Sequence, residues 1–272
     1  HISNTKSLLI RAIDRRLVSD VPISLNLSGG IDSGAICSIA SKVLGKKLET
    51  FSIIDSDDRY NESDLIKITA KDCGVKNNIV RLNNKINFFD ILNKSTEYNN
   101  YPVFTITDLI HYYLSSFIKK KGFKVSLSGA GADEIYGGYY DHYLMIFREL
   151  NLSDKKKLKE YVNIWKRDIQ PNLRNKFFTK YNLFFKKHNF RGYVFDNYKN
   201  NKKFCIKKVD YNFKEEKYFS SLIKNRMANE LFHETVPMFM HREDHNSMQF
   251  SIENRTPFLD TNLIEYLFSV KG

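Results

Sequence analysis

The first half of the chain alternates short apolar runs with segments whose apolar residues recur at helical spacing. The apolar runs cover residues 23–27, 48–54, 79–82 and 123–127, and each has the length of a buried strand. The periodic segments predict helices over residues 8–17, 34–40, 61–73, 88–98 and 105–121. Gly74 and Gly122 stand where two of these helices would end. Strands that alternate with helices predict an α/β fold with a doubly wound parallel sheet and right-handed crossovers.

This alternation stops in residues 151–217, where lysine and asparagine are abundant. Apolar spacing there predicts one helix around Trp165 and a second over residues 177–185. Helical patterns resume from Tyr218 onward. We therefore expect a lysine-rich helical appendage on the α/β domain, followed by a helical C-terminal part. We assign no chemistry to the appendage.

Composition and charge narrow the class of protein. The 272 residues carry a formal charge of +12. Much of the excess lies in residues 155–217, and we interpret it as a solvated lysine-rich surface rather than as a nucleic-acid site. Three scattered cysteines without a CxxC pair fit a reducing compartment. Because no apolar run reaches the roughly 20 residues of a membrane span and no signal peptide is evident, we expect a cytoplasmic protein without a membrane partner.

The first predicted strand runs into a turn, residues 28–33, that reads Ser-Gly-Gly-Ile-Asp-Ser and precedes a predicted helix. Gly29 and Gly30 would let the backbone pass close to a ligand and adopt angles that a side chain forbids. The N–H groups of the turn and of the helix start then point to one place, which suits an anion such as phosphate. The segment is neither the lysine-containing P-loop nor GxGxxG. The plainer alternative is a Ser/Gly-rich turn before a helix.

A second turn of small residues follows the strand at 123–127. It runs from Ser128 to Tyr139 and contains the carboxylates Asp133 and Glu134. Ligands of parallel α/β folds sit at the carboxyl ends of the strands, so Asp32 and Asp133 are expected to lie at the same edge. A Mg²⁺ ion, which prefers oxygen ligands, would allow these carboxylates to stand beside phosphates. The alternative is that Asp133 and Glu134 only favour the start of a helix.

A third polar stretch occupies residues 241–260, which read HREDHNSM and, after two residues, SIENRTPFLD. His233, His241 and His245 fall in or near it. A metal cluster is conceivable from these histidines, but exposed or hydrogen-bonded histidines are the better interpretation.

Three motifs thus occur in order: SGGIDS, LSGAGADEIYGGY, and EDHNSM followed by SIENRTPFLD. Together they resemble the synthetase domain of glutamine-hydrolysing asparagine synthetases, over about residues 8–268. The resemblance implies a fold of the adenine nucleotide alpha hydrolase type, also called the PP-loop ATP pyrophosphatase type. It implies ATP and Mg²⁺ as cofactors. It also implies a two-step reaction in which aspartate or a related acid forms an acyl-adenylate with release of pyrophosphate, and ammonia derived from glutamine then forms the amide.

The resemblance further implies roles for residues of this chain. The pyrophosphate would be held by Ser28, Gly29, Gly30, Asp32 and Ser33. The adenine would be held by the backbone at Asn26 and Ile53, and the nucleotide site would be lined by Ser128 and Gly129. The ligands of Mg²⁺ would be Asp32 and Asp133. The catalytic residues on the side of the acid substrate would be Asp244, Glu253 and Arg255.

Three features depart from the family pattern. The chain begins at His1, whereas family members begin with a glutaminase domain, so we expect that domain to be a covalent partner missing here. The chain stops at Gly272, where the family continues into a helical part with a phosphate-binding lysine, so we expect a truncated C-terminal end. Ala130 stands where many asparagine synthetases have glutamate, which leaves the identity of the small-molecule acid open.

Several alternatives stay open at this point. The acid could be a sugar carboxylate, such as a uronic acid in surface-polysaccharide synthesis. An RNA-modifying PP-loop enzyme is mildly favoured by the basic charge, but the chain has neither paired catalytic cysteines nor an evident RNA-binding aromatic motif. A non-catalytic nucleotide-binding module and a homodimer are further options.

Overall fold

The computed structural model describes residues 1–55, 57, 61–82, 86–186 and 215–270. These residues form two compact units. The first comprises His1–Ile135 and the chain from Glu234 onward, and the second comprises Tyr136–His233. The expected appendage therefore falls inside the second unit, and its residues 187–214 lie outside the described residues.

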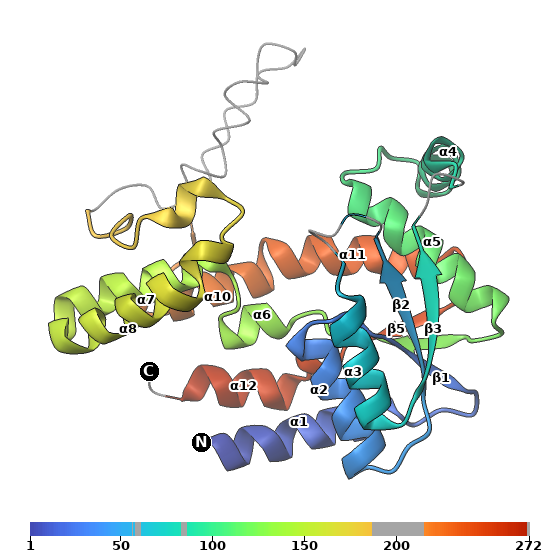
Figure 1. The fold of residues 1–272 in the computed structure, drawn as a ribbon, viewed down its shortest axis with the longest axis horizontal. Helices are drawn as coiled ribbons and strands as arrows, with labels where there is room; N and C mark the ends of the chain where they lie inside the picture. The colour runs from blue at the N-terminus through green and yellow to red at the C-terminus, as the bar shows by residue number, and fades with distance from the viewer. Residues whose placement is uncertain (56, 58–60, 83–85, 187–214, 271–272) are drawn as a thin grey trace. The chain divides into compact units, whose positions relative to one another are not determined.

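The first unit is organised around a parallel sheet with the strand order β3-β2-β1-β4-β5 (Figure 1). The strands are β1 (Ile23–Asn26), β2 (Glu49–Ile54), β3 (Lys76–Arg81), β4 (Val125–Leu127) and β5 (Glu253–Arg255). The helices are α1 (Ile2–Arg16), α2 (Ile31–Ser38), α3 (Ser63–Cys73), α4 (Phe88–Asn99), α5 (Ile106–Lys120), α6 (Ala132–Tyr136), α11 (Thr235–Met248) and α12 (Thr261–Ser269). The expected α/β fold with a parallel sheet is confirmed.

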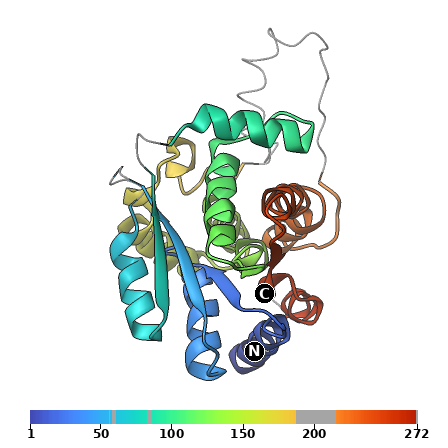
Figure 2. The same ribbon diagram turned by 90° about the vertical axis from the view of Figure 1, so that its right-hand side faces the viewer.

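Helices cover both faces of this sheet. Side chains of each strand alternate between the two faces, so each face offers side chains for the helices to pack on. On one face Phe51 of β2 and Ile252, just before β5, pack with Ile118 of α5 in a buried cluster. α2 contacts β1, and α3 contacts β2. Figure 2 shows α3 and α5 on opposite sides of the strands. The sheet is therefore doubly wound, and its carboxyl edge is left to the turns that follow the strands.

Local sequence signals set the ends of several helices. Gly74 ends α3 with a φ of 62°, and Gly122 follows α5 with a φ of 87°. Both values lie in the left-handed region, which glycine adopts without steric cost. Thr105 and Asp108 form a reciprocal capping box at the start of α5. These residues explain why α3 and α5 begin or end close to where the pattern predicts.

Three local features differ from the sequence prediction. β5 was not predicted, because its residues Glu253, Asn254 and Arg255 are all polar. The helix after the first turn continues beyond α2 as a π-helical turn, Ile39–Val43. The third strand begins at Lys76, three residues before the apolar run that predicted it.

The second unit has a core of its own. Its helices are α7 (Tyr140–Ser153), α8 (Lys155–Asp168) and α10 (Leu222–Phe232), and 3₁₀ turns occur at Gln170–Asn172 and Lys176–Thr179. The helix around Trp165 is confirmed as α8. The helix predicted over residues 177–185 is wrong, because only a short 3₁₀ turn and further turns occupy that segment. Its residues Phe178 and Phe184 are nevertheless buried together with Trp165.

A buried ion-pair network joins the helices of the second unit. The guanidinium of Arg226 is 1% exposed and lies within 3.0 Å of carboxylate oxygens of Asp141, Glu215 and Glu230. His142 completes the network through a 2.9 Å contact between its Nε2 and Glu230. Asp141, His142 and Glu230 could also hold a metal ion by their geometry. We assign none, because the Arg226 guanidinium already contacts the carboxylates of Asp141 and Glu230, and its positive charge would repel a cation there.

Both described cysteines are free and buried. Burial raises the pKa of the Cys37 thiol to about 12, and the neighbouring Cys73 adds to the effect. A thiol with so high a pKa is a poor nucleophile, so Cys37 acts as a small apolar side chain. Cys205 lies outside the described residues. In the same described part of the chain, every helix is too short or too polar to cross a bilayer.

Gly131→Ala is expected to lower the free energy of unfolding by about 2–4 kcal/mol. Gly131 has a φ of +90°, and a Cβ atom there would lie 2.3 Å from Cδ2 and 2.6 Å from Cγ of Leu259. The matched control is Gly45→Ala, because Gly45 also has a positive φ of +62° but open space around it. Urea unfolding of both variants measures the difference in the free energy of unfolding. Equal losses would show that the contact with Leu259 does not add to the cost of the positive φ.

Candidate active site

The turn between β1 and α2 is held in shape by its two serines. The backbone N–H of Ser28 donates to Oγ of Ser33 at 3.1 Å, and the Ser33 hydroxyl lies 3.1 Å from the Ser28 carbonyl oxygen. The N–H of Gly30 donates to Oγ of Ser28 at 3.2 Å. Ser33 is buried, so it closes the turn from inside. The turn is therefore pre-organised by its own side chains.

The start of α2 is open for an anion. Gly30 is the N-cap residue, and among the described residues no side chain forms a cap hydrogen bond to the helix. The first N–H groups of a helix have no partner within the helix and carry the positive end of its dipole. Asp32 and Ser33 of the predicted site lie in this first turn. Phosphate oxygens would satisfy these donors.

The two adjacent glycines have a different explanation from the predicted one. Gly30 has a φ of −78°, and the φ of Gly29 also lies outside the left-handed region, so neither needs an angle that other residues avoid. At Gly29 the restriction is close packing. A Cβ atom there would lie 2.7 Å from Cβ of Glu62 and 3.1 Å from Cβ of Leu65. The expectation of special backbone angles at these glycines is therefore wrong.

The second turn, after β4, lies directly against the first. A Cβ atom on Gly129 would be 3.1 Å from Cβ of Asp32 and 3.2 Å from the backbone nitrogen of Ser33. Asp133 follows in the first turn of α6. Burial raises the pKa of the Asp32 carboxyl, and the negative charge of Asp133 raises it further. The structure thus brings Asp32 and Asp133 together in a pair whose charged form a cation would stabilise.

The remaining predicted nucleotide residues lie along the same edge. Asn26 ends β1, and its side-chain Oδ1 accepts a hydrogen bond from Ser126 at 3.1 Å. Ile53 is in the neighbouring strand β2, two residues beyond the register partner of Asn26. Ser128 follows β4, and its buried hydroxyl has no hydrogen-bond partner among the described residues. An unsatisfied buried hydroxyl is costly, so it is a candidate donor to a ligand or a water.

Two of the predicted catalytic residues lie on β5. The Arg255 carbonyl accepts a hydrogen bond from Ser128 N at 3.0 Å, which ties β5 to the turn after β4. The guanidinium of Arg255 points elsewhere. It donates to the carbonyls of Arg16 and Val18, at 2.8 and 2.7 Å, and pairs with Glu253 at 2.8 Å. Arg255 therefore caps the C-terminal end of α1, and its role toward a substrate stays a prediction.

Asp244, the third predicted catalytic residue, is exposed on α11. Among the described residues no hydrogen bond joins it to Glu253 or Arg255. Its neighbour Glu243 bonds to His111 of α5. The rings of His241 and His245 lie 4.3 Å apart beside Tyr101. His233 belongs to the second unit and bonds to Tyr218. These contacts fit hydrogen-bonded or stacked histidines.

The sequence prediction missed two residues at this edge. Glu62, the N-cap residue of α3, accepts a 3.0 Å hydrogen bond from the N–H of Gly29. Asn254 of β5 has a buried side-chain amide with no partner among the described residues. The available signal for Glu62 was weak. Glu62 is a carboxylate that follows β2 and starts α3, and β2 lies beside β1 in the sheet. Its hydrogen bond to Gly29 depends on the tertiary structure.

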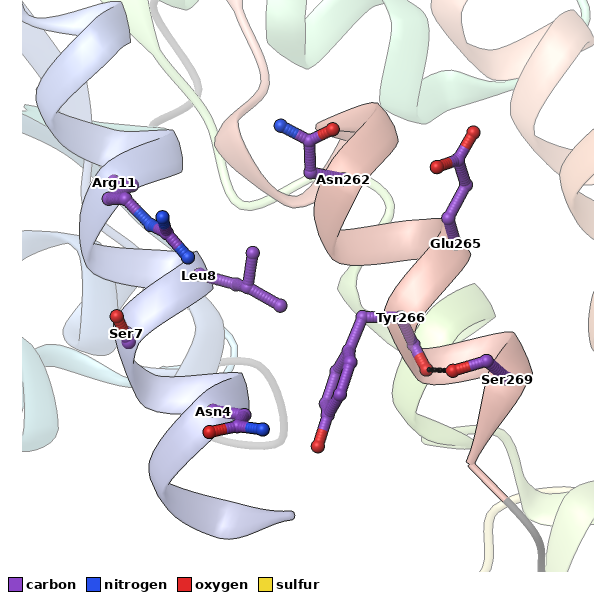
Figure 3. Close-up of a pocket in the computed structure, with 8 residues that line it drawn as sticks. All are labelled: Asn4, Ser7, Leu8, Arg11, Asn262, Glu265, Tyr266 and Ser269. Carbon is purple, nitrogen blue, oxygen red and sulfur yellow. Dashed lines mark hydrogen bonds between the residues drawn. The ribbon is translucent and has the colours of Figure 1, made fainter.

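A surface pocket lies away from these residues. It lies between α1 and α12, has a volume of about 580 Å³, and is lined by Asn4, Ser7, Leu8, Arg11, Asn262, Glu265, Tyr266 and Ser269 (Figure 3). None of the predicted site residues lines it. We therefore do not include it in the candidate site.

Parallel strands with two small-residue turns that meet at the carboxyl ends of β1 and β4 are typical of nucleotide-binding α/β domains. The family profile described as asparagine synthase matches residues 4–272. The chain therefore belongs to the asparagine synthase family.

Curated proteins that are similar to the chain include two that are named asparagine synthetases. Glutamine-hydrolysing asparagine synthetase 3 of Bacillus subtilis is 27% identical over 99% of this chain, which spans 42% of that protein. Glutamine-hydrolysing asparagine synthetase 2 of rice, Oryza sativa, is 33% identical over 55% of this chain and 27% of its own length. A protein of Gibberella zeae named amidase chry2 is 29% identical over 48% of this chain and 22% of its own length. The chain thus spans less than half of each of these relatives.

Proposed function

We propose that this chain is the synthetase part of an ATP-dependent, AMP-forming amide ligase. A carboxylate of aspartate or a related acid attacks the α-phosphate of ATP, which gives an acyl-adenylate and releases pyrophosphate. Ammonia derived from glutamine then displaces AMP and leaves the amide. A glutaminase domain of the longer protein would supply the ammonia. The membership in the asparagine synthase family supports the reaction class.

The observation that carries this proposal is the meeting of the two turns. The uncapped start of α2 offers N–H groups to phosphate oxygens, and Gly129 brings the second turn within van der Waals contact of Asp32. The reaction requires that the charge on the phosphates is stabilised and that the acid is positioned. N–H donors at the start of α2 would stabilise the phosphate charge. Ser28, Gly29, Gly30 and Ser33 would hold the pyrophosphate, while the backbone at Asn26 and Ile53 would hold the adenine.

The donor set at this place also fits Mg²⁺. Two carboxylates, Asp32 and Asp133, are close enough for one to raise the pKa of the other, and oxygen ligands are those that Mg²⁺ prefers. When bound, the ion would neutralise charge between these carboxylates and the phosphates. Ser128 and Gly129 would line the nucleotide, and Asp244, Glu253 and Arg255 would act on the side of the acid.

The test is ATP–pyrophosphate exchange by the full-length protein with a panel of carboxylic acids. Adenylation predicts exchange that depends on one acid or a narrow group of acids. Exchange with none of them, together with no binding of ATP, would contradict the proposal. The panel includes aspartate and uronic acids, because Ala130 favours a second candidate, the amidation of another carboxylate.

Ala130→Glu is expected to raise aspartate-dependent release of pyrophosphate. Ala130 lies between Ser128 and Asp133 in the turn after β4, and its methyl group can neither accept a hydrogen bond from an amino group nor take a proton. A general base commonly contributes about 10²–10⁴-fold. Either Glu134 or Glu253 supplies that base, or aspartate is not the natural acid, and we favour the second explanation. Efficient formation of asparagine by the wild type, with no gain from Ala130→Glu, would restore aspartate as the substrate.

A further inference from the structure

The N–H of Gly29 already has an anionic partner inside the protein. The Glu62 side chain reaches it with Oε2 at 3.0 Å. The contact is built in, because the missing Cβ of Gly29 leaves the space in which Glu62 and Leu65 pack against the turn. A carboxylate thus accepts a hydrogen bond from the turn to which the proposed function assigns pyrophosphate.

A carboxylate oxygen and a phosphate oxygen are the same kind of acceptor for a backbone N–H. They cannot both take the single proton of Gly29 in a good hydrogen bond. They also repel each other as like charges, and the contact is exposed enough for the side chain to leave. Two arrangements of the turn therefore exclude each other: Gly29 bonded to Glu62, and Gly29 bonded to a phosphate oxygen.

We propose that Glu62 is an internal competitor of the pyrophosphate group for the turn between β1 and α2. Nucleotide binding then requires the Glu62 carboxylate to leave the N–H of Gly29. This inference rests on the proposed function, since it assumes that the turn holds a pyrophosphate group. Its consequence is that the wild type binds pyrophosphate-containing ligands more weakly than the bare turn would.

The size of the effect follows from the hydrogen bond that must be broken. We assume that this hydrogen bond contributes the usual net free energy of a protein hydrogen bond. Glu62→Ala is then expected to bind inorganic pyrophosphate, in the presence of Mg²⁺, about three- to tenfold more tightly than wild type. Glu62→Gln removes the charge but keeps a carbonyl that can still accept from Gly29, so its gain is smaller. AMP has no β- and γ-phosphates, so its affinity does not change in either variant.

Asp64→Ala is the matched control. Asp64 is an exposed carboxylate in the first turn of the same helix, α3, and its ion-pair partner is Lys67. The variant removes the same charge from the same region without touching Gly29. Its affinity for pyrophosphate should stay within about twofold of wild type, since exposed charges at a distance are strongly screened.

Calorimetric titration with pyrophosphate, Mg-ATP and AMP decides the matter. Tighter binding of pyrophosphate by Glu62→Ala, but not by Asp64→Ala, supports the competitor. Unchanged or weaker binding by Glu62→Ala overturns it, and weaker binding would mean that Glu62 orders the turn for its ligand. If wild type binds Mg-ATP while Glu62→Ala gains nothing, only this inference fails. If no variant binds either ligand, the proposed function fails with it.

A second readout follows Gly29 itself. The protein has twelve glycines, so labelling glycine with ¹⁵N gives a spectrum with few signals. Pyrophosphate should shift the Gly29 signal of wild type, and Glu62→Ala should shift it without any ligand. A Gly29 signal that pyrophosphate leaves in place, in a protein that binds pyrophosphate, would overturn the exchange of partners.

Discussion

Asp32→Ala is expected to abolish measurable Mg-ATP binding, with a loss of at least about a hundredfold, while the protein stays folded. Asp32 lies in the first turn of α2. Gly129 of the second turn packs so close to it that a Cβ atom on Gly129 would lie 3.1 Å from Cβ of Asp32. It is therefore placed where both turns of the candidate site meet. Without its carboxylate, Asp133 alone would have to hold the cation. Calorimetric titration with Mg-ATP measures the loss.

The same substitution should not harm the fold. Burial and Asp133 raise the pKa of Asp32, so the charged form is disfavoured in the folded state. This cost is fully present above the raised pKa and is relieved as the pH falls through it. Asp32→Ala removes the cost, so the metal-free variant should be at least as stable as wild type at neutral pH. Thermal unfolding without added metal checks this.

Asp14→Ala is the control, because it makes the same chemical change at an exposed position of α1. It should bind Mg-ATP like wild type. Unchanged affinity in Asp32→Ala would remove this residue from the nucleotide site. A loss of binding accompanied by unfolding would show instead that Asp32 is needed for the fold.

The parallel sheet was predictable because its inner strands carry the signal that burial leaves in a sequence. β1 and β2 lie inside the sheet, so their residues are mostly buried and include apolar side chains such as Leu25 and Phe51. β5, the edge strand beside β4 in the described part of the chain, gives no such signal because its residues are all polar. Its Arg255 is needed at the end of α1, which no local pattern indicates.

The spacing of aromatic residues predicts a helix over residues 177–185, but the structure has turns there. The aromatic residues of this segment recur at spacings typical of a helix, yet Phe178 and Phe184 are buried in one cluster. Six residues of regular helix would place them about 120° apart, near the two edges of one broad apolar stripe. In the structure, turns bring both side chains to the core of the second unit instead. Spacing alone does not distinguish a helical face from a chain that doubles back on one core.

The candidate site was predictable as far as it depends on strand ends. Asp32 and Asp133 come together because β1 and β4 are parallel neighbours whose carboxyl ends meet. The contact between Gly29 and Glu62 spans 33 residues and depends on how α3 packs over the first turn. Such packing is decided by tertiary structure. The sequence therefore indicated that the glycines matter, but not that Gly29 is required by its close packing against Glu62 and Leu65.

Arg226→Ala is expected to lower the free energy of unfolding by about 3–5 kcal/mol. The guanidinium is almost completely buried and contacts carboxylates of Asp141, Glu215 and Glu230 at 3.0, 2.7 and 3.0 Å. Its removal leaves buried or partly buried negative charges without their partner, and this costs more than the loss of the pairs themselves. Urea unfolding followed by the fluorescence of Trp165, which is buried in the same unit, measures the change.

Two further variants separate charge from shape. Arg226→Lys keeps the charge but offers one compact ammonium in place of a planar fork with three contacts, so its loss should be intermediate. Arg167→Ala removes an exposed arginine that pairs with Asp168 in the same unit, and its unfolding midpoint should match wild type. If Arg226→Ala unfolded at the same urea concentration as Arg167→Ala, the network would contribute nothing to stability. The three carboxylates would then have to reach water or other partners once the guanidinium is gone.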